Sequence, residues 1–338
     1  MTEYLFVLGR DRNLAVLELE SVFSIDSVKK VNNQFAIVET DKKIDLERFG
    51  GITKFGRRIN SAEDVIFDKG KLSYTAAGDK KLLLELKSRF KEERIKATFR
   101  KFNFEPRNLD YEFIKFDNKL FLVDERSDPK KYRFRDENRP RFDAKKVISI
   151  RMAKMLINFS KAEKEILDPF CGNGTILQEG LFRGFHVIGV DQHIKESLDN
   201  LKWVKKQFQL KSKFTLIPGD AKNLEKIEKV ECCVTEPYLG PYFKKLPSSS
   251  KGKRVIRSLA SLYDGLFREL SRKVEKRVVI IIPAIRTFNK ILEVDFKTIL
   301  EKHGFKLVRS NVELPIAYNN PRAKVLREIW VLERLEKL

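Results

Sequence analysis

The sequence predicts an α/β protein whose doubly wound, Rossmann-like sheet has an antiparallel edge and follows a smaller α+β portion. Three observations lead to this prediction. From Lys164 onward, short apolar segments alternate with amphipathic helical segments, which is typical of a mostly parallel sheet with helices on its faces. The last two apolar segments follow each other without a helix between them, which indicates the antiparallel edge. The first 130 residues mix short strands with helices and lack this alternation.

Within the first 130 residues, strands are expected at 4–9, 34–40, 94–102 and 111–125. Helices with basic exposed faces are expected at 13–24 and 80–93. We expect the sheet of this portion to be antiparallel.

The second part of the chain begins with an expected buried strand at 165–170, and further strands are expected at 186–191, 213–220, 231–237 and 277–283. Helices are expected at 175–184, 195–208, 255–274 and 289–304, the last ending in a Gly cap. The closing strand pair is expected at 305–314 and 326–335.

These portions define the expected domains, 1–130 and 148–338. The segment between them is rich in charge and Pro, so we expect 131–147 to be a charged linker. A helix is expected at 145–160, where the second domain begins.

The composition indicates a nucleic-acid partner. The 338 residues include 69 Lys and Arg against 48 Asp and Glu, a net charge of +21. A compact protein with this charge repels itself unless a polyanion is near, so nucleic acid or an anionic surface is the expected partner. A lysine-rich proteome is the alternative explanation of this charge.

Other function classes are excluded by what the sequence contains. Three cysteines and three scattered histidines form neither a disulfide framework nor a metal site, and a reducing cytoplasm fits this usage. The longest apolar run, 278–285, is far shorter than the ~20 residues of a membrane helix, so no membrane association is expected. The N-terminal segment does not have the pattern of a signal peptide.

Acidic residues follow three of the predicted strands. Asp168 precedes a turn with Gly172 and Gly174, where the backbone can approach a ligand closely. Asp191 ends the next strand, at the distance expected of a carboxylate that holds ribose hydroxyls, and Asp220 follows the third strand. Because the carboxyl ends of parallel strands share one edge, these acids outline one crevice. Taken singly, each Asp is better explained as a helix cap or a turn residue.

The pattern favours a cationic cofactor without phosphates. A dinucleotide fingerprint would have a third glycine at Leu177, and no Lys-Ser or Lys-Thr of a P-loop follows the turn. Acidic side chains suit the sulfonium and amino groups of S-adenosylmethionine (AdoMet), which is the predicted cofactor. The predicted cofactor-binding residues are Asp168, Pro169, Phe170, Cys171, Gly172, Asn173, Gly174, Asp191, Gln192, Asp220 and Ala221. Cys171 is interpreted as a small buried side chain.

In this order, the motifs "DPFCGNG", "GVD" and "GDA" and a later Pro-Tyr loop resemble the class I methyltransferases that act on exocyclic amines. The segment 132–177 is more closely similar to the archaeal and eukaryotic tRNA guanosine-10 N2-methyltransferase family, as are the opening "YLFVLGRDRNLAVLELESV" and the closing "REIWVLER". The resemblance implies AdoMet-dependent methylation of guanosine in tRNA and an N-terminal, ferredoxin-like THUMP module that binds the tRNA. It also implies that Arg135, Asp136 and Arg139 shape a lid of the cofactor pocket, with a structural ion-pair network as the alternative.

The segment "TEPYLGP" departs from the family, which has Asp-Pro-Pro-Tyr-Gly there; a milder departure is Asn173, where the family usually has Thr or Ser. Guanine N2 is a poor nucleophile because its lone pair is delocalised, so a methylase needs acceptors for its N–H bonds and an aromatic face for the flipped base. The resemblance makes Pro237 and Tyr238 the counterparts of the second proline and the aromatic residue. Glu236 offers an anionic acceptor and Thr235 a hydroxyl oxygen. These four are the predicted catalytic residues; a capping or ion-pairing role is the alternative for Glu236.

Two other functions stay open. One is methylation of another exocyclic amine, such as adenine N6 in RNA or DNA or guanine N2 in rRNA, and the other is an RNA-binding paralogue without catalysis. The basic segment 242–254 is expected to be a loop that either contacts phosphates or is merely solvated. Tyr318 and the residues 319–324 are further candidates for the substrate edge. No motif identifies an accessory protein.

Overall fold

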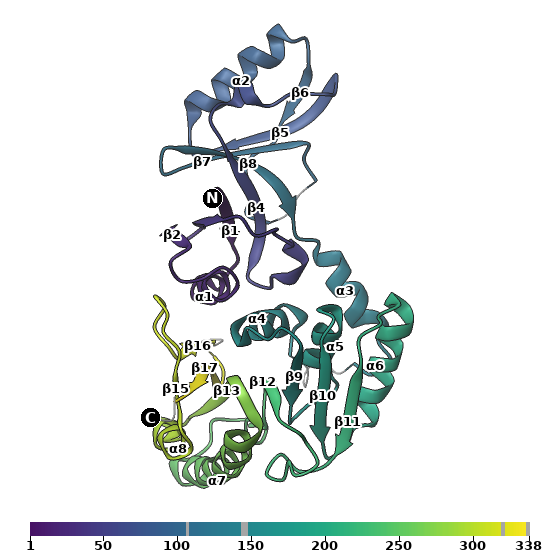
Figure 1. The fold of residues 1–338 in the computed structure, drawn as a ribbon. Helices are drawn as coiled ribbons and strands as arrows, with labels where there is room; N and C mark the ends of the chain where they lie inside the picture. Colours follow the sequence, from purple (N-terminus) through teal and green to yellow (C-terminus); the bar gives the residue numbers. More distant parts are fainter. Residues whose placement is uncertain (106–107, 143–147, 319–321, 336–338) are drawn as a thin grey trace. The chain divides into compact units, whose positions relative to one another are not determined.

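The computed structural model describes residues 1–105, 108–142, 148–318 and 322–335. The chain forms two compact units, Met1–Lys131 and Tyr132–Leu338, and each contains its own sheet (Figure 1).

The first unit is built on an eight-stranded sheet. Its strands are β1 Thr2–Leu8, β2 Val28–Val31, β3 Phe35–Thr40, β4 Ile52–Ile59, β5 Lys71–Ala77, β6 Lys96–Phe99, β7 Tyr111–Phe116 and β8 Lys119–Arg126. They lie in the order β2-β3-β1-β4-β8-β7-β5-β6. The expectation of an antiparallel sheet is wrong for β5, which runs parallel to β6 and β7. The reason is helix α2 (Lys80–Glu92), which returns the chain across the sheet between β5 and β6.

Local sequence signals explain the elements of this unit. Helix α2 begins after Asp79, whose carboxylate accepts the Lys81 N–H at 2.8 Å, and it buries Leu82, Leu86 and Phe90, spaced four residues apart. The expected strand 111–125 is a hairpin of β7 and β8, because Asp117 and Asn118 both take positive φ in the turn. The other helices are α1 Arg12–Val22 and the short 3-10 helices η1 Leu46–Arg48 and η2 Ala62–Asp64.

The second unit is built on a nine-stranded sheet with helices packed against it (Figure 1). Its strands are β9 Glu165–Asp168, β10 His186–Asp191, β11 Phe214–Pro218, β12 Val230–Thr235, β13 Val274–Arg286, β14 Ile291–Glu293, β15 Phe305–Leu307, β16 Ile316–Ala317 and β17 Val325–Arg334. Its helices are α4 Ile150–Ser160, α5 Thr175–Phe182, α6 Lys195–Phe208, α7 Ser249–Lys273 and α8 Phe296–His303, and α3 Pro129–Asn138 leads into the unit.

The main path of this sheet runs β11-β10-β9-β12-β13-β17-β15. The first five strands are parallel, and β17 runs antiparallel to both β13 and β15. The predicted doubly wound sheet with an antiparallel edge is therefore confirmed. It is the arrangement of a Rossmann-like fold.

Strand β13 lies near the middle of the sheet and is buried on both faces. Val278, Ile280 and Ile282 pack into the hydrophobic core that includes α7 and α8, whereas the intervening Val279 and Ile281 are buried on the opposite side. This explains why the segment is a continuous apolar run, which the sequence alone cannot distinguish from a short buried helix.

Four expectations about element boundaries are corrected. Part of the expected linker 131–147 is helical, because α3 extends to Asn138; residues 143–147 lie outside the described part of the chain. The expected helix 289–304 is instead strand β14 followed by α8, which begins after Asp295 caps the Thr298 N–H. Helix α7 begins at Ser249, six residues before the expected start, because the Ser248 hydroxyl accepts the Lys251 N–H. The expected strand 305–314 is limited to β15.

Within the described residues, no helix is long and apolar enough to cross a membrane. The same residues contain no group of three side chains suited to holding a metal ion.

Candidate active site

The site lies at the carboxyl ends of neighbouring strands in the second unit. Asp168 ends β9, Asp191 ends β10 and Thr235 ends β12, and β9 pairs with both of the other strands. These residues, separated by up to 67 positions, therefore meet at one edge of the sheet.

The Gly-x-Gly turn between β9 and α5 depends on backbone conformations that glycine adopts readily. Gly172 has φ of 46° and Gly174 has φ of 78°. At Gly174 a Cβ would also lie 3.2 Å from the Ser197 Cβ on α6, so a side chain there would be crowded in addition to being strained by the positive φ. The turn places the start of α5, at Thr175, beside the pocket.

Asp168 is buried and fixed by two hydrogen bonds. Its Oδ1 accepts the Thr235 hydroxyl hydrogen at 2.7 Å and the Phe170 N–H at 3.1 Å. Burial raises the pKa of Asp168 to about 7, and the hydrogen bond from Thr235 opposes this rise. The carboxyl group therefore titrates near neutral pH.

Asp191 shapes the glycine turn from the neighbouring strand. Its Oδ2 accepts the Gly172 N–H at 3.0 Å, and its Oδ1 accepts the His193 N–H at 3.0 Å. Asp220 is placed differently, because it is exposed and its Oδ1 accepts the Lys222 N–H at 2.9 Å in a local turn. The structure thus brings Asp168 and Asp191 together at the turn. Asp220 follows Gly219, whose N–H donates to the Asp191 carbonyl oxygen at 3.0 Å, so the third acid lies at the neighbouring strand end, although it is not among the residues that line the pocket.

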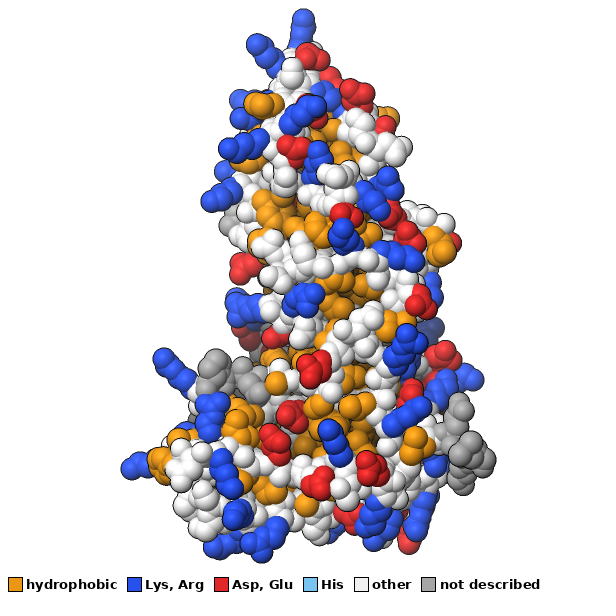
Figure 2. All heavy atoms as spheres, turned by 90° about the vertical axis from the view of Figure 1, so that its left-hand side faces the viewer, with side chains coloured by type: hydrophobic (Ala, Val, Ile, Leu, Met, Phe, Trp, Pro, Cys, Tyr) orange, Lys and Arg blue, Asp and Glu red, His pale blue; other side chains and the backbone are white. Residues whose placement is uncertain are grey.

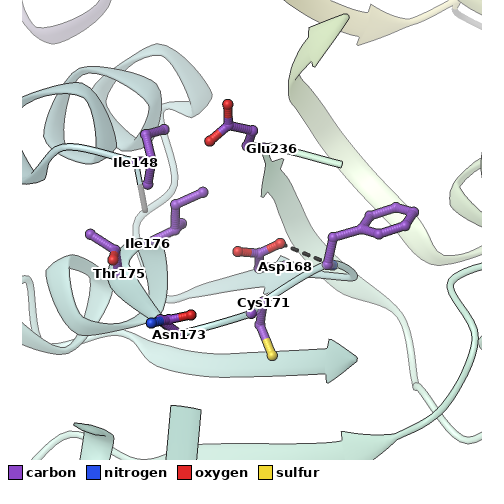
Figure 3. A pocket seen from close by; sticks show the side chains of 9 residues that line it. Ile148, Asp168, Cys171, Asn173, Thr175, Ile176 and Glu236 are labelled. Carbon is purple, nitrogen blue, oxygen red and sulfur yellow. Dashed lines mark hydrogen bonds between the residues drawn. The ribbon is translucent and has the colours of Figure 1, made fainter. Parts of the chain in front are cut away.

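A pocket opens between the glycine turn and Glu236, which follows β12; Glu236 and Asp168 both line it (Figure 3). Burial raises the pKa of the Glu236 carboxyl group. Glu236 Oε1 is buried and has no hydrogen-bond partner in the described part of the chain, although the Arg327 Nε lies 3.3 Å away as an ion pair. A buried carboxylate oxygen without a hydrogen bond is costly, so it is suited to accept an N–H from a ligand.

The lining of this pocket agrees with the sequence prediction in part. The predicted residues that line it are Asp168, Phe170, Cys171, Gly172, Asn173 and Glu236, and the additional lining residues are Ile148, Thr175 and Ile176. Thr175 could have been found as the first helical residue after the glycine turn, whereas Ile148 has no local signal. Cys171 is buried, and burial raises the pKa of its thiol far above the ordinary value, which argues against a nucleophilic role.

The comparison with protein families decides the assignment of this unit. The model of the RMKL-like methyltransferase domain matches residues 138–312, more than half of the chain. The chain belongs to this family.

Two curated relatives match shorter segments. A tRNA (guanine(10)-N2)-dimethyltransferase of Methanothermobacter thermautotrophicus is 37% identical over 98 residues, 28% of this chain and 28% of that protein. A probable tRNA (guanine(10)-N2)-dimethyltransferase of Methanothermococcus thermolithotrophicus is 29% identical over 151 residues, 42% of this chain and 85% of that protein. The chain thus aligns with little more than a quarter of the first relative's length.

Among solved structures, TrmN from Thermus thermophilus has a TM-score of 0.51 and 14% sequence identity. The likeness covers 98% of this chain and 100% of that one. At this identity it concerns the fold, and it agrees with a class I methyltransferase fold in the second unit.

In the methyltransferase domain, the four predicted catalytic residues occupy different environments. Thr235 is fully buried and its hydroxyl donates to Asp168, so it orients this carboxyl group. Glu236 lines the pocket. Pro237 is buried, and Tyr238 is 54% exposed with its carbonyl oxygen held by the Tyr263 hydroxyl at 2.9 Å.

The charged residues before the domain contact helix α5. The Arg135 Nη1 donates to Glu179 Oε1 at 2.5 Å, and the Arg139 Nη1 donates to the Thr175 hydroxyl at 2.9 Å. Asp136 forms an ion pair with Arg139 at 2.9 Å. The ion-pair network that the sequence left open is therefore present, and it reaches the pocket wall at Thr175.

The candidate substrate segments differ from the expectation in part. The basic segment 242–254 is a loop only as far as Ser248, since α7 begins at Ser249. Tyr318 is partly buried, and its N–H donates to the Arg327 carbonyl oxygen at 2.8 Å. Residues 319–321 lie outside the described part of the chain.

Proposed function

We propose that this protein is an AdoMet-dependent tRNA methyltransferase that methylates the exocyclic N2 amine of a guanosine, at position 10 of the tRNA. The observation that carries the proposal is the pair of carboxyl groups that line a class I cofactor crevice, Asp168, which is buried, and Glu236, which is partly buried. The printed names of the curated relatives support the choice of substrate and position.

The residues present fit AdoMet. The pocket carries two acidic side chains and, among the described residues that line it, no Lys or Arg, so it favours the cationic groups of this cofactor. Asp191 would hold the ribose hydroxyls, and the turn leaves space for the cofactor at Gly172, which lines the pocket and where a Cβ would meet no atom closer than 4.0 Å. When bound, AdoMet supplies an electrophilic methyl group.

The loop after β12 would hold the target amine. Glu236 Oε1 can accept one N–H of the amine, because it is buried and no described residue forms a hydrogen bond with it. The carbonyl group next to Pro237 can accept the other, since the ring of proline fixes the local backbone. Tyr238 is exposed beside these acceptors and offers an aromatic face on which a flipped base can stack. When both N–H bonds donate to these acceptors, the amine becomes pyramidal and its lone pair turns toward the methyl donor.

The departure from the family's Asp-Pro-Pro-Tyr loop is consistent with activity in this arrangement. Thr235 takes the position of the family's acidic residue, but its hydroxyl is committed to Asp168. Glu236, one residue later, places its carboxylate in the pocket instead. Proximity and electrostatic preorganisation then account for most of the rate of a methyl transfer.

The surface charge supports tRNA as the substrate. The chain has a net charge of +21, and Lys and Arg side chains are spread over the face drawn in Figure 2, with fewer Asp and Glu among them. We propose that the first unit is a THUMP-like module that binds the tRNA, because its mixed sheet carries α2 with a basic exposed side.

The proposal is tested by incubating the protein with methyl-labelled AdoMet and, separately, with unmodified tRNA, rRNA and DNA. The nucleic acids are then digested and the nucleosides are identified by mass spectrometry. N2-methylguanosine from tRNA is the expected product. N6-methyladenine, or N2-methylguanosine found in rRNA alone, would show that the enzyme acts on a different amine or a different nucleic acid. A protein that binds the cofactor but transfers no methyl group would be an RNA-binding paralogue without catalysis.

A further inference from the structure

The proposed cofactor carries a negative group for which the pocket wall offers no charged partner. AdoMet has a carboxylate in addition to its cationic sulfonium and amino groups. The described residues that line the pocket include Asp168 and Glu236 but no Lys or Arg. The inference below therefore rests on the proposed function and concerns the residue that holds this carboxylate.

Arg139 is a buried cation next to this wall. Its side chain is 1% exposed, and its Nη1 donates to the hydroxyl of Thr175, which lines the pocket and begins α5. The guanidinium group also lies over the Phe142 ring, 4.6 Å from its centroid. These contacts fix the group beside the N-terminal end of α5, where the helix dipole favours an anion.

The other edge of the Arg139 guanidinium group has unused hydrogen-bonding capacity. Its Nε and Nη2 are buried and have no hydrogen-bond partner among the residues that the structure describes. The Asp136 carboxylate lies 2.9 Å from Nη2, but this contact does not have the alignment of a hydrogen bond. Nε and Nη2 form the edge of arginine that binds a carboxylate through two parallel hydrogen bonds. Nη2 carries two hydrogens, so it can bind a second carboxylate while Asp136 stays in place.

The neighbouring Arg135 provides a comparison, because its guanidinium group is engaged in contacts within the fold. Arg135 donates to Glu179 Oε1 at 2.5 Å and lies over the Phe182 ring, 4.5 Å from its centroid. Its role is accounted for by these contacts within the fold. Within the described part of the chain, Arg139 makes a single side-chain hydrogen bond, although leaving buried donors unpaired is unfavourable.

We propose that Arg139 binds the carboxylate of AdoMet through its Nε and Nη2 hydrogens. Asp136 and Thr175 hold the guanidinium group in the orientation that this contact requires. Arg139 is then a cofactor-binding residue that contacts the amino-acid end of the ligand. The residues of the glycine turn and Asp191 bind the nucleoside end.

The test compares two ligands that differ in the amino-acid part. S-adenosylhomocysteine carries the carboxylate, whereas 5′-methylthioadenosine has the same nucleoside and sulfur but lacks the amino-acid part. Their affinities are measured by isothermal titration calorimetry for the full chain and for Arg139→Gln. We expect the variant to lose about tenfold to a hundredfold in affinity for S-adenosylhomocysteine, the effect of a lost charge-assisted hydrogen-bond pair, and to bind methylthioadenosine as before.

Arg141→Gln is the matched control. Arg141 is an arginine of the same segment, half-exposed, whose Nε pairs with Asp199 at 3.1 Å on α6. We expect this variant to bind both ligands like the wild type. An equal loss for both ligands in Arg139→Gln, or no loss for either, overturns the inference.

Two further measurements keep the inference testable if Arg139→Gln does not fold. The wild type should bind decarboxylated AdoMet more weakly than AdoMet, and equal affinities overturn the inference. Arg139→Lys, which keeps the charge without the two-hydrogen edge, should bind S-adenosylhomocysteine more weakly than the wild type does and methylthioadenosine as before; unchanged affinity for S-adenosylhomocysteine overturns the inference. A wild type that binds neither AdoMet nor S-adenosylhomocysteine overturns the proposed function itself, which separates the two failures.

Discussion

The Thr235 hydroxyl donates a hydrogen bond of 2.7 Å to the buried Asp168 carboxylate, across the adjacent ends of β12 and β9. This bond joins the first residue of the candidate catalytic loop to the first acidic residue of the candidate cofactor site. It stabilises the ionised form of Asp168 in surroundings that otherwise disfavour a charge. The loop that departs from its family pattern is thus tied directly to the cofactor crevice.

The stability of the protein should depend on pH through Asp168. Burial raises the pKa of this group from 3.8 to about 7, so the folded protein binds a proton that the unfolded chain has already released over this range. The free energy of unfolding therefore falls as pH rises from about 4 to about 7. Urea unfolding at a series of pH values should show this fall in the wild type, and a weaker one in Asp168→Asn.

Thr235→Val provides the complementary variant because valine has nearly the shape of threonine but no hydroxyl. It removes the hydrogen bond that lowers the pKa of Asp168, so the titration should move to higher pH. Unfolding curves of wild type, Asp168→Asn and Thr235→Val that run parallel over this pH range would contradict the assignment of the titration to Asp168.

Glu236→Gln should slow methyl transfer without weakening cofactor binding appreciably. The amide removes the anionic acceptor for the target amine, and loss of a group that orients the transition state typically costs about 10²-fold in rate. Single-turnover rates and S-adenosylhomocysteine affinity measure the two effects. Glu328→Gln is the control, since this carboxylate on β17 accepts from the Trp330 Nε1 at 3.3 Å and does not line the pocket. Full activity of Glu236→Gln would show that Glu236 is not an acceptor.

Asp191→Ala should abolish AdoMet binding and leave tRNA affinity nearly intact. The alanine removes both the expected ribose contact and the acceptor that holds the Gly172 N–H at 3.0 Å. Calorimetry with AdoMet and filter binding with tRNA separate the two affinities. Asp199→Asn on α6 is the control, because Asp199 pairs with Arg141 instead. Equal AdoMet affinity of wild type and Asp191→Ala would refute this cofactor site.

Binding of tRNA should weaken steeply with salt. If Lys and Arg side chains neutralise phosphates, the logarithm of the binding constant falls linearly with the logarithm of salt concentration, with a slope of about −0.7 to −0.9 for each phosphate neutralised. Fluorescence anisotropy with labelled tRNA measures this slope. S-adenosylhomocysteine affinity, measured at the same salt concentrations, should change little. A flat response for tRNA would remove the electrostatic argument drawn from the net charge.

Local patterns predict the part of the site that is continuous in sequence. The glycines at 172 and 174 and the aspartates at 168 and 191 follow strands, so the parallel sheet places them together whatever the detailed packing. Asp220 follows a strand in the same way, but its side chain is used by the local turn at Lys222. The end of a predicted strand thus indicates where in the fold a residue lies, but it does not determine which group the side chain contacts.

Contacts between distant segments were not predictable from these patterns. The bond from Thr235 to Asp168 joins residues 67 positions apart and requires that β12 lie beside β9. The contact of Arg139 with Thr175 depends on how the segment after α3 returns to α5. In both cases the sequence gives suitable residue types, whereas strand order and tertiary packing decide the partners.

The most direct test of the account uses two tRNA transcripts that differ only at nucleotide 10, guanosine in one and inosine in the other. Inosine lacks the exocyclic N2 amine and keeps the rest of the purine. After incubation with AdoMet and digestion, mass spectrometry should find N2-methylguanosine at position 10 of the first transcript and no methyl group at that position in the second. Methylation of both transcripts, or of neither by a protein that binds AdoMet, would contradict the assignment of the reaction to this amine.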